Sequence, residues 1–169
     1  MSDPDSPRLH GLAPVVAPDA RLVLLGSFPG VASLQAQQYY GHPRNQFWPL
    51  LSAVWGEDLV ALPYAQRLQR LQARRVALWD VYAACRREGS LDSAIEDAQF
   101  NDFPALRRLA PGLVAAAHNG GESAKARRHL EALGLVVHRL PSSSPANASW
   151  SFQRKLAEWR AVFAAYDLV

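Results

Sequence analysis

The 169-residue chain has little of what marks several specialised classes of protein. With one cysteine, Cys85, it can form neither an internal disulfide framework nor a four-cysteine zinc site nor a cysteine-ligated iron–sulfur cluster. It has no run of about 18 apolar residues that could span a bilayer, and the polar segment 1–7 lacks the apolar stretch of a secretory signal. We therefore expect a reduced, cytoplasmic protein that acts as a monomer and has no membrane partner.

Common catalytic signatures are absent as well. No G-x-S-x-G segment supports a serine hydrolase, and the glycine spacing fits neither a Walker A loop nor a dinucleotide-binding fingerprint. The histidines are scattered without the spacing of metal ligands: His10, His42, His118, His129 and His138. The sequence therefore predicts no metal site and no cofactor.

The charge balance points only weakly to a partner. The chain has 18 Lys and Arg against 15 Asp and Glu, a net charge of +3, which is a small excess for a protein that binds nucleic acid. Arginines occur in adjacent pairs, such as Arg86-Arg87 and Arg107-Arg108, and solvated helix faces explain such pairs most simply. Charge alone therefore does not decide the function.

What the sequence does contain is an alternation of short apolar runs with helical segments. The continuous apolar runs are typical of strands buried on both faces of a parallel sheet, and they cover residues 21–26, 76–81, 113–117 and 135–140. Helices are expected between and after them, at 45–54, 64–74, 102–109 with Asp102 as its cap, 122–133 ending at Gly134, and 149–166 with Trp150 buried. This order predicts an α/β fold, a three-layer αβα sandwich with a central four-stranded parallel sheet, in one domain (14–169) after a flexible tail (1–13).

Ligands of such sheets bind beyond the carboxyl ends of the strands, so the loops that follow the runs are the candidate site. The first loop contains two glycines and a proline at 26–30, and then two tyrosines and a His-Pro pair before Asn45. The last loop places three serines between two prolines at 141–145, which suits either a phosphate-binding turn or a plain linker. The segment 79–92 adds carboxylates and arginines to the same edge, and the turn at 118–121 offers backbone N–H groups.

Taken together, these segments resemble the uracil-DNA glycosylase superfamily, and within it the branch of hypoxanthine-DNA (deoxyinosine) glycosylases. The resemblance is carried by Gly-Ser-Phe-Pro-Gly at 26–30, by Gly-His-Pro-Arg-Asn-Gln-Phe-Trp at 41–48, by the segment 78–92 with Asn119-Gly120, and by Leu-Pro-Ser-Ser-Ser-Pro-Ala-Asn at 140–147. It implies a protein that flips a deaminated base, hypoxanthine or uracil, out of DNA and hydrolyses its N-glycosidic bond without a cofactor.

The resemblance also implies roles for individual residues. Asn45 is expected to act in catalysis, either by positioning water or by binding the base, together with the backbone N–H groups at Ser27 and Phe28. The expected base-binding residues are Tyr40 as the stacking ring, His42, Gly26, Pro29 and Asn119. The expected DNA-binding residues are Ser142, Ser143, Ser144, Pro145, Ala146, Asn147 and Arg44.

Two positions depart from the common pattern of the superfamily. Phe28 stands where an Asp or Asn usually positions the attacking water, and Leu140 stands where a His or Asn usually stabilises the leaving base. Both departures are those of the hypoxanthine branch. A mismatch-specific uracil or thymine glycosylase is the alternative within the superfamily, and a DNA- or nucleotide-binding module without catalysis is the alternative of another class.

Overall fold

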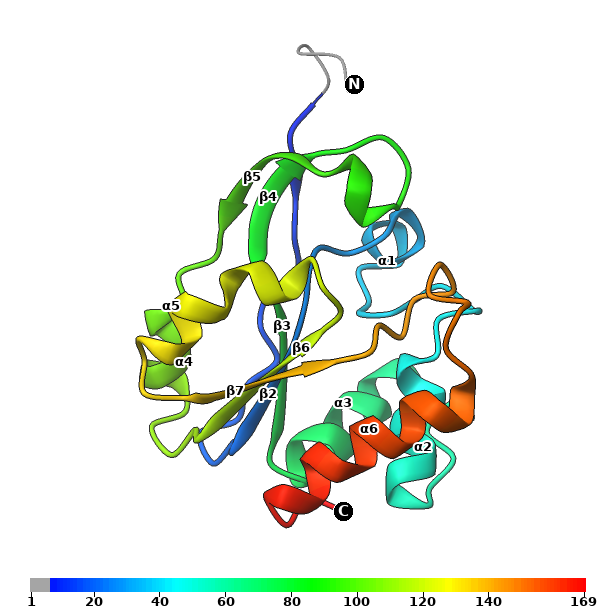
Figure 1. Ribbon diagram of the computed structural model, residues 1–169, viewed down its shortest axis with the longest axis vertical. Helices are drawn as coiled ribbons and strands as arrows, with labels where there is room; N and C mark the ends of the chain where they lie inside the picture. The colour runs from blue at the N-terminus through cyan, green and yellow to red at the C-terminus, as the bar shows by residue number, and fades with distance from the viewer. Residues whose placement is uncertain (1–6) are drawn as a thin grey trace.

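The computed structural model describes residues 7–169, and a four-stranded parallel sheet lies at its centre (Figure 1). In spatial order the strands are β3 (Val76–Asp80), β2 (Leu22–Gly26), β6 (Ala115–Asn119) and β7 (Val136–Leu140). β2, β3 and β7 lie within predicted apolar runs, and β6 begins and ends two residues later than the run 113–117. Leu24 of β2 lies opposite Leu78 on one side and Ala117 on the other. The predicted four-stranded parallel sheet is confirmed.

Helices cover both faces of this sheet. Figure 1 shows α2 (Phe47–Trp55), α3 (Tyr64–Ala73) and α6 (Phe152–Ala165) on one side, and α4 (Pro104–Leu109) and α5 (Arg127–Glu131) on the other. The predicted apolar stripe of α2 is buried along its whole length. The three-layer arrangement is therefore the predicted one, and no helix within residues 7–169 has the length and apolarity that a membrane crossing requires.

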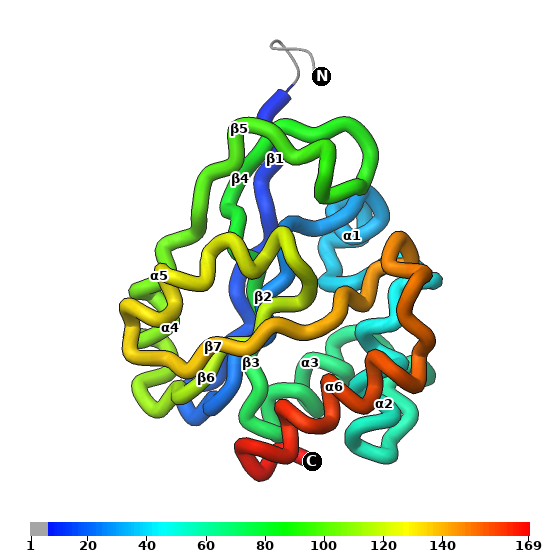
Figure 2. Tube along the Cα trace, in the orientation of Figure 1, coloured from blue at the N-terminus to red at the C-terminus, as the bar shows by residue number. Residues whose placement is uncertain are grey.

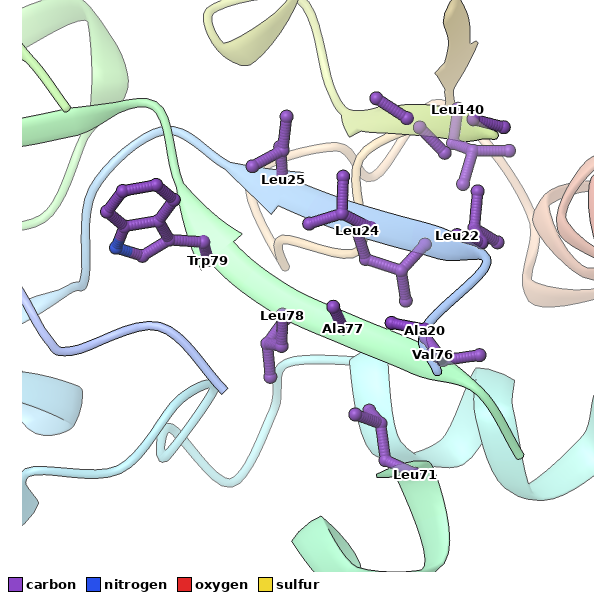
Figure 3. Packing of buried hydrophobic residues seen from close by; sticks show 14 of the residues in the cluster. Ala20, Leu22, Leu24, Leu25, Leu71, Val76, Ala77, Leu78, Trp79 and Leu140 are labelled. Carbon is purple, nitrogen blue, oxygen red and sulfur yellow. The ribbon is translucent and has the colours of Figure 1, made fainter. Parts of the chain in front are cut away.

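The core lies between these layers and holds the strands in place. Figure 3 shows Leu71 of α3 directed at β3, whose Val76, Ala77 and Leu78 have no exposed surface. Burying one Val or Leu side chain contributes about 1.5–3 kcal/mol, so the strands are held firmly along their length. Their carboxyl ends, which carry the polar residues, are consequently a rigid support.

A second sheet, which the sequence analysis did not predict, extends the fold beyond these strand ends. Strand β4 (Tyr82–Arg86) pairs antiparallel with β1 (Leu9–His10) and with β5 (Glu96–Phe100). β5 is mostly exposed and polar and β1 has two residues, so neither leaves a hydrophobic pattern. Because Leu9 pairs with Cys85, the chain is hydrogen-bonded from residue 9 onward, where we predicted a loose tail to residue 13; residues 1–6 lie outside the described part.

Other local differences concern helix ends. The N-cap of α4 is Phe103, and the Asp102 carboxylate instead pairs with Arg108 at 3.0 Å, so the predicted cap is wrong. The predicted helix 122–133 is divided into a 3-10 turn (Ser123–Ala126) and α5. Because α5 ends at Glu131 with Ala132 as its C-cap, the predicted cap at Gly134 is wrong, although Gly134 has a positive φ of 82°. The Ser123 hydroxyl donates to the Leu25 carbonyl and holds this first turn close to β2.

Two further differences lie near the strand ends. A short helix, α1 (Val31–Ala36), follows the first loop and was not predicted, because its six residues are too few to show a period. Trp150 was expected inside the last helix, but α6 begins two residues later. The indole is half-buried and lies beneath the Arg154 guanidinium, 4.0 Å from the ring centroid.

Candidate active site

The strand ends open onto a cavity of about 740 Å³, which lies within the usual size of about 300–1,000 Å³ for small-molecule sites. Its walls come from segments far apart in the sequence: 26–33, 39–45, 90–92, 119–121 and 139–147, with Asp80 among them. Figure 2 shows the segment after β7 running beside the segment that leads into α2. Every residue that the sequence analysis selected lines this cavity except Arg44.

One wall is a hydrogen-bond network of Asn45, Asn119 and Ser143, called here the amide wall. The Ser143 hydroxyl donates to Asn45 Oδ1 at 2.8 Å and accepts from Asn119 Nδ2 at 2.9 Å. The Ser143 N–H donates to Asn119 Oδ1 at 2.9 Å, and its carbonyl accepts from the Gln46 N–H at 2.9 Å. The amide wall therefore joins the loop after β7 to the end of β6 and to the start of α2.

Within this wall, Asn45 keeps one hydrogen-bonding group free. Its Oδ1 accepts from both the Phe47 N–H at 2.9 Å and the Ser143 hydroxyl at 2.8 Å, which occupies both lone pairs. Its Nδ2 has no acceptor among residues 7–169, and the side chain lines the cavity. Asn45 can thus donate to an acceptor atom of a bound base, and this geometry favours base binding over activation of a water.

Tyr40 forms the aromatic surface of the cavity. Its ring stacks on Phe47 with centroids 3.9 Å apart and planes within 11°, and its hydroxyl accepts from Asn119 Nδ2 at 3.2 Å. Burial raises the pKa of the Tyr40 phenol well above its usual range, so the hydroxyl stays protonated. With one face covered by Phe47, the other face is the side on which a planar ligand can stack.

The loop after β2 is held by a buried arginine. Arg87, which is 7% exposed, donates to the Pro29 carbonyl at 2.7 Å and lies over the Phe28 ring, 5.3 Å from its centroid. The prediction that the arginine pairs are solvated is wrong for Arg87, because this side chain packs inside the fold. The N–H groups of Ser27 and Phe28 have no acceptor within residues 7–169, so the loop presents two backbone donors.

A second wall, called here the acidic wall, carries Asp80 and Asp92. Asp92 Oδ1 accepts from the Ser27 hydroxyl at 2.6 Å. Asp80 is the last residue of β3 and 5% exposed, and its Oδ2 is buried without a hydrogen-bond partner among the described residues. Burial and the neighbouring Asp92 raise the pKa of Asp80 to about 7, against the opposing effect of Arg87. The Asp80 carboxyl therefore keeps its proton to near neutral pH.

The rim of the cavity is polar and basic. The loop 142–147 places Pro145 and Ala146 at the surface, and His42, which also lines the cavity, is exposed. The exposed Arg139 extends over Gly121, where an added Cβ would lie 2.8 Å from Arg139 Nη2. Arg139 has no ion-pair partner in the described part of the chain.

The sequence placed the carboxylates of segment 79–92 at this edge, but we assigned no site role to Asp80 or Asp92 and did not select Arg139, and all three line the cavity. A signal for Asp80 was present: it is the charged residue that ends an otherwise apolar buried strand, at the edge where parallel sheets bind ligands. Arg139 gave no such signal, because its direction depends on the register of β7 against β6. Within residues 7–169 no three His, Cys, Asp or Glu gather in a way that could hold a metal ion.

Comparison with known proteins identifies relatives of this chain. Two curated relatives are a hypoxanthine DNA glycosylase from Methanosarcina barkeri, 39% identical over 154 residues, and one from Methanosarcina acetivorans, 40% identical over 154 residues. Each alignment covers 91% of this chain and 97% of the relative. The similarity therefore extends over nearly the whole length of both proteins.

Solved structures and family models agree with this result. A solution NMR structure of a candidate uracil DNA glycosylase from Methanosarcina acetivorans superposes with a TM-score of 0.85 at 38% identity, covering 95% of this chain and 99% of that one. The model of the uracil DNA glycosylase superfamily matches residues 13–166, which include every strand of the central sheet and the whole cavity. The chain belongs to the uracil DNA glycosylase superfamily.

Proposed function

We propose that the protein is a monofunctional DNA glycosylase that excises hypoxanthine, the base of deoxyinosine, from DNA. The observation that carries the proposal is the convergence of the four strand-end segments on one cavity, which combines a stacking ring, Tyr40, with free hydrogen-bond donors. An enzyme that acts on a flipped base needs both, because it must hold the ring and read its edge. The names and the extent of similarity of the two Methanosarcina relatives support hypoxanthine as the base.

The free donors suit the chemistry of glycosidic cleavage. The flipped base stacks on Tyr40, and the N–H groups of Ser27 and Phe28, with Asn45 Nδ2, donate to its acceptor atoms as electron density shifts onto it. The deoxyribose becomes oxocarbenium-like, and water adds to its anomeric carbon. Neither lysine of the chain lines the cavity, and Lys155 is buried and donates to Gln46 Oε1 at 2.8 Å, which argues against a covalent amine intermediate.

The rim provides the contacts to DNA in this proposal. The serine-rich loop 142–147, Arg139 and Arg44 contact phosphates on either side of the flipped nucleotide, and His42 lies between them and the base. The enzyme acts as a monomer on cytoplasmic DNA and uses no metal or cofactor.

The test is release of a damaged base under single-turnover conditions. Matched duplexes carry hypoxanthine, uracil or xanthine at one position, and release is measured as alkali-sensitive abasic sites. We expect the fastest release from the hypoxanthine duplex, and loss of release in Asn45→Ala. Faster release of uracil would favour the mismatch-specific alternative. Binding to all duplexes without release of any base would show a binding module and contradict the proposal.

A further inference from the structure

We infer that Asp80 is the acid of the reaction, whose carboxyl proton passes to N7 of the departing purine. The inference rests on the proposed function and adds to it a catalytic residue and a chemical reason for preferring purines. N7 is the most basic ring nitrogen of a 6-oxopurine, and pyrimidines have no equivalent atom.

The position of Asp80 places its carboxyl at the edge of the stacking surface. Asp80 and Gly26 lie side by side in the register of β3 and β2. A Cβ on Gly26 would lie 2.5 Å from Asp80 Oδ1 and 2.8 Å from the Tyr40 hydroxyl, so both groups approach the same point from different elements. Glycine at position 26 is thus required for this approach, and the edge of a base stacked on Tyr40 lies within reach of the carboxyl.

The bonding of Asp80 marks it as a group without a structural role in the described chain. Its Oδ2 is buried and has no partner, although its residue lines the cavity. Leaving a buried polar group unpaired destabilises a fold, so an unpaired group in a native structure calls for an explanation such as a catalytic role. Asp92 differs, because its carboxylate accepts a hydrogen bond from Ser27.

The groups around Asp80 keep a proton on it near neutral pH. They come from the neighbouring strands, loops and helix, and they are Asp92, Arg87, Tyr39, Tyr40 and Tyr64. Burial and Asp92 raise the pKa of Asp80 to about 7, while Arg87 acts in the opposite direction. A general acid is most effective when its pKa lies near the working pH.

An acid adds to what the Ser27, Phe28 and Asn45 donors supply, because this site lacks the side chain that usually stabilises the base anion in the superfamily. Leu140 stands where relatives in the superfamily carry a His or Asn for that purpose. In the step we infer, the C1′–N9 bond breaks with its electron pair remaining on N9, and the Asp80 proton is transferred to N7. The purine then leaves as a neutral molecule. Water adds to C1′, its surplus proton goes to solvent, and Asp80 regains a proton from solvent.

The experiment compares Asp80→Asn with the wild type on duplexes containing hypoxanthine or 7-deazahypoxanthine, which has carbon in place of N7. On hypoxanthine, single-turnover release by Asp80→Asn should fall about 10²–10⁴-fold, the usual contribution of general acid catalysis. The wild type should lose a similar factor on the 7-deaza duplex, whereas Asp80→Asn should lose little more. The wild-type rate on hypoxanthine should also fall above about pH 7, and Asp80→Asn should lack this dependence.

The controls separate chemistry from folding. Asp102→Asn removes an exposed carboxylate that pairs with Arg108 outside the cavity, and its release rate should equal the wild-type rate. If Asp80→Asn does not fold, Asp92→Asn replaces it and should shift the fall in rate to lower pH, because Asp92 raises the pKa of Asp80.

Three results would overturn the inference. The first is an unchanged release rate in a folded Asp80→Asn variant. The second is that the rate losses caused by Asp80→Asn and by the 7-deaza base multiply when the two are combined. The third is that Asp92→Asn leaves the pH at which the rate falls unchanged. If the wild type releases no hypoxanthine, the proposed function itself is contradicted.

Discussion

The two walls of the cavity differ in whether their buried polar groups have hydrogen-bond partners. In the amide wall, the side chain of Asn119 uses its oxygen and both amide hydrogens, and Ser143 uses its hydroxyl and both backbone groups. In the acidic wall, Asp80 leaves a buried oxygen with no partner in the described chain. A satisfied network holds its members in one geometry, whereas an unsatisfied carboxyl retains the capacity to exchange a proton. The difference separates the groups that position a base from the group that reacts with it.

The strongest way to break the amide wall is Asn45→Ala. The substitution removes the free Nδ2 donor together with the acceptor for Phe47 and Ser143. We expect single-turnover release of hypoxanthine to fall about 10²–10³-fold, as for the loss of one oriented transition-state donor.

Asn45→Asp is the matched control for this prediction. It keeps an acceptor oxygen for the Phe47 N–H but has no amide donor, so it should be as slow as Asn45→Ala while its thermal melting midpoint stays near the wild-type value. Wild-type activity in Asn45→Asp would show that the residue serves only to accept the Phe47 N–H at the start of α2.

Asp80 in the acidic wall should make the free energy of unfolding depend on pH. The pKa of Asp80 is about 7 in the fold and about 3.9 in the unfolded chain. Between these values the folded protein keeps a proton that the unfolded chain has lost, so the free energy of unfolding decreases as pH rises through this window. Asp80→Asn has no carboxyl proton to lose, so at about pH 8 its free energy of unfolding should exceed that of the wild type by on the order of 2–4 kcal/mol.

Urea unfolding at about pH 5 and about pH 8 measures this difference. The excess stability of Asp80→Asn should be much smaller at the lower pH, and Asp102→Asn should show no comparable change between the two conditions. A stability difference of the same size at both pH values would mean that Asp80 is already ionised in the fold.

A smaller effect is expected where the two walls meet, at Tyr40. Tyr40→Ala keeps the same backbone, including its positive φ of 55°, but removes the ring, so binding of the flipped base should weaken by about 1–3 kcal/mol. Tyr40→Phe keeps the ring and loses only a hydroxyl that accepts from Asn119, so its effect should be mild. Affinity for a duplex with a non-hydrolysable deoxyinosine analogue tests both variants, and equal losses would mean that the phenol, not the ring face, binds the base.

The smallest effect is expected at the rim, outside both walls. Arg139→Gln removes a cation that has no ion-pair partner in residues 7–169. The slope of log affinity against log salt concentration should decrease in magnitude by about 0.9, the value of one phosphate contact. Arg108→Gln, which alters an arginine away from the cavity, should leave the slope unchanged. An unchanged slope in Arg139→Gln would exclude a phosphate contact at this residue.

The centre of the sheet could be predicted because burial on both faces makes its strands continuous apolar runs, as in Leu22–Gly26 and Val76–Asp80. The second sheet could not, because Glu96–Phe100 is exposed on most of its residues and has no such pattern. Helix Val31–Ala36 has only six residues, so it is shorter than two helical turns and shows no recurring period.

The candidate site divides in a similar way. Asn45, Tyr40 and the loop 142–147 could be selected because they belong to contiguous motifs that follow strands. The pairing of Asn45 with Ser143 spans 98 residues and depends on the packing of α2 beside the end of β7, which no local pattern encodes. The protonation state of Asp80 depends in turn on what surrounds it in space, above all its burial and then the neighbouring Asp92.

The stacked pair of Tyr40 and Phe47 has a consequence for how the enzyme should respond to heat. Phe47 meets the edge of Trp159 of α6 with centroids 5.8 Å apart, and the Trp159 indole donates to the Pro141 carbonyl at 3.0 Å. One fully buried indole thus supports both the stacking surface and the start of the serine-rich loop. Warming that loosens α6 should disorder both together, so excision should fail at a temperature below that of global unfolding.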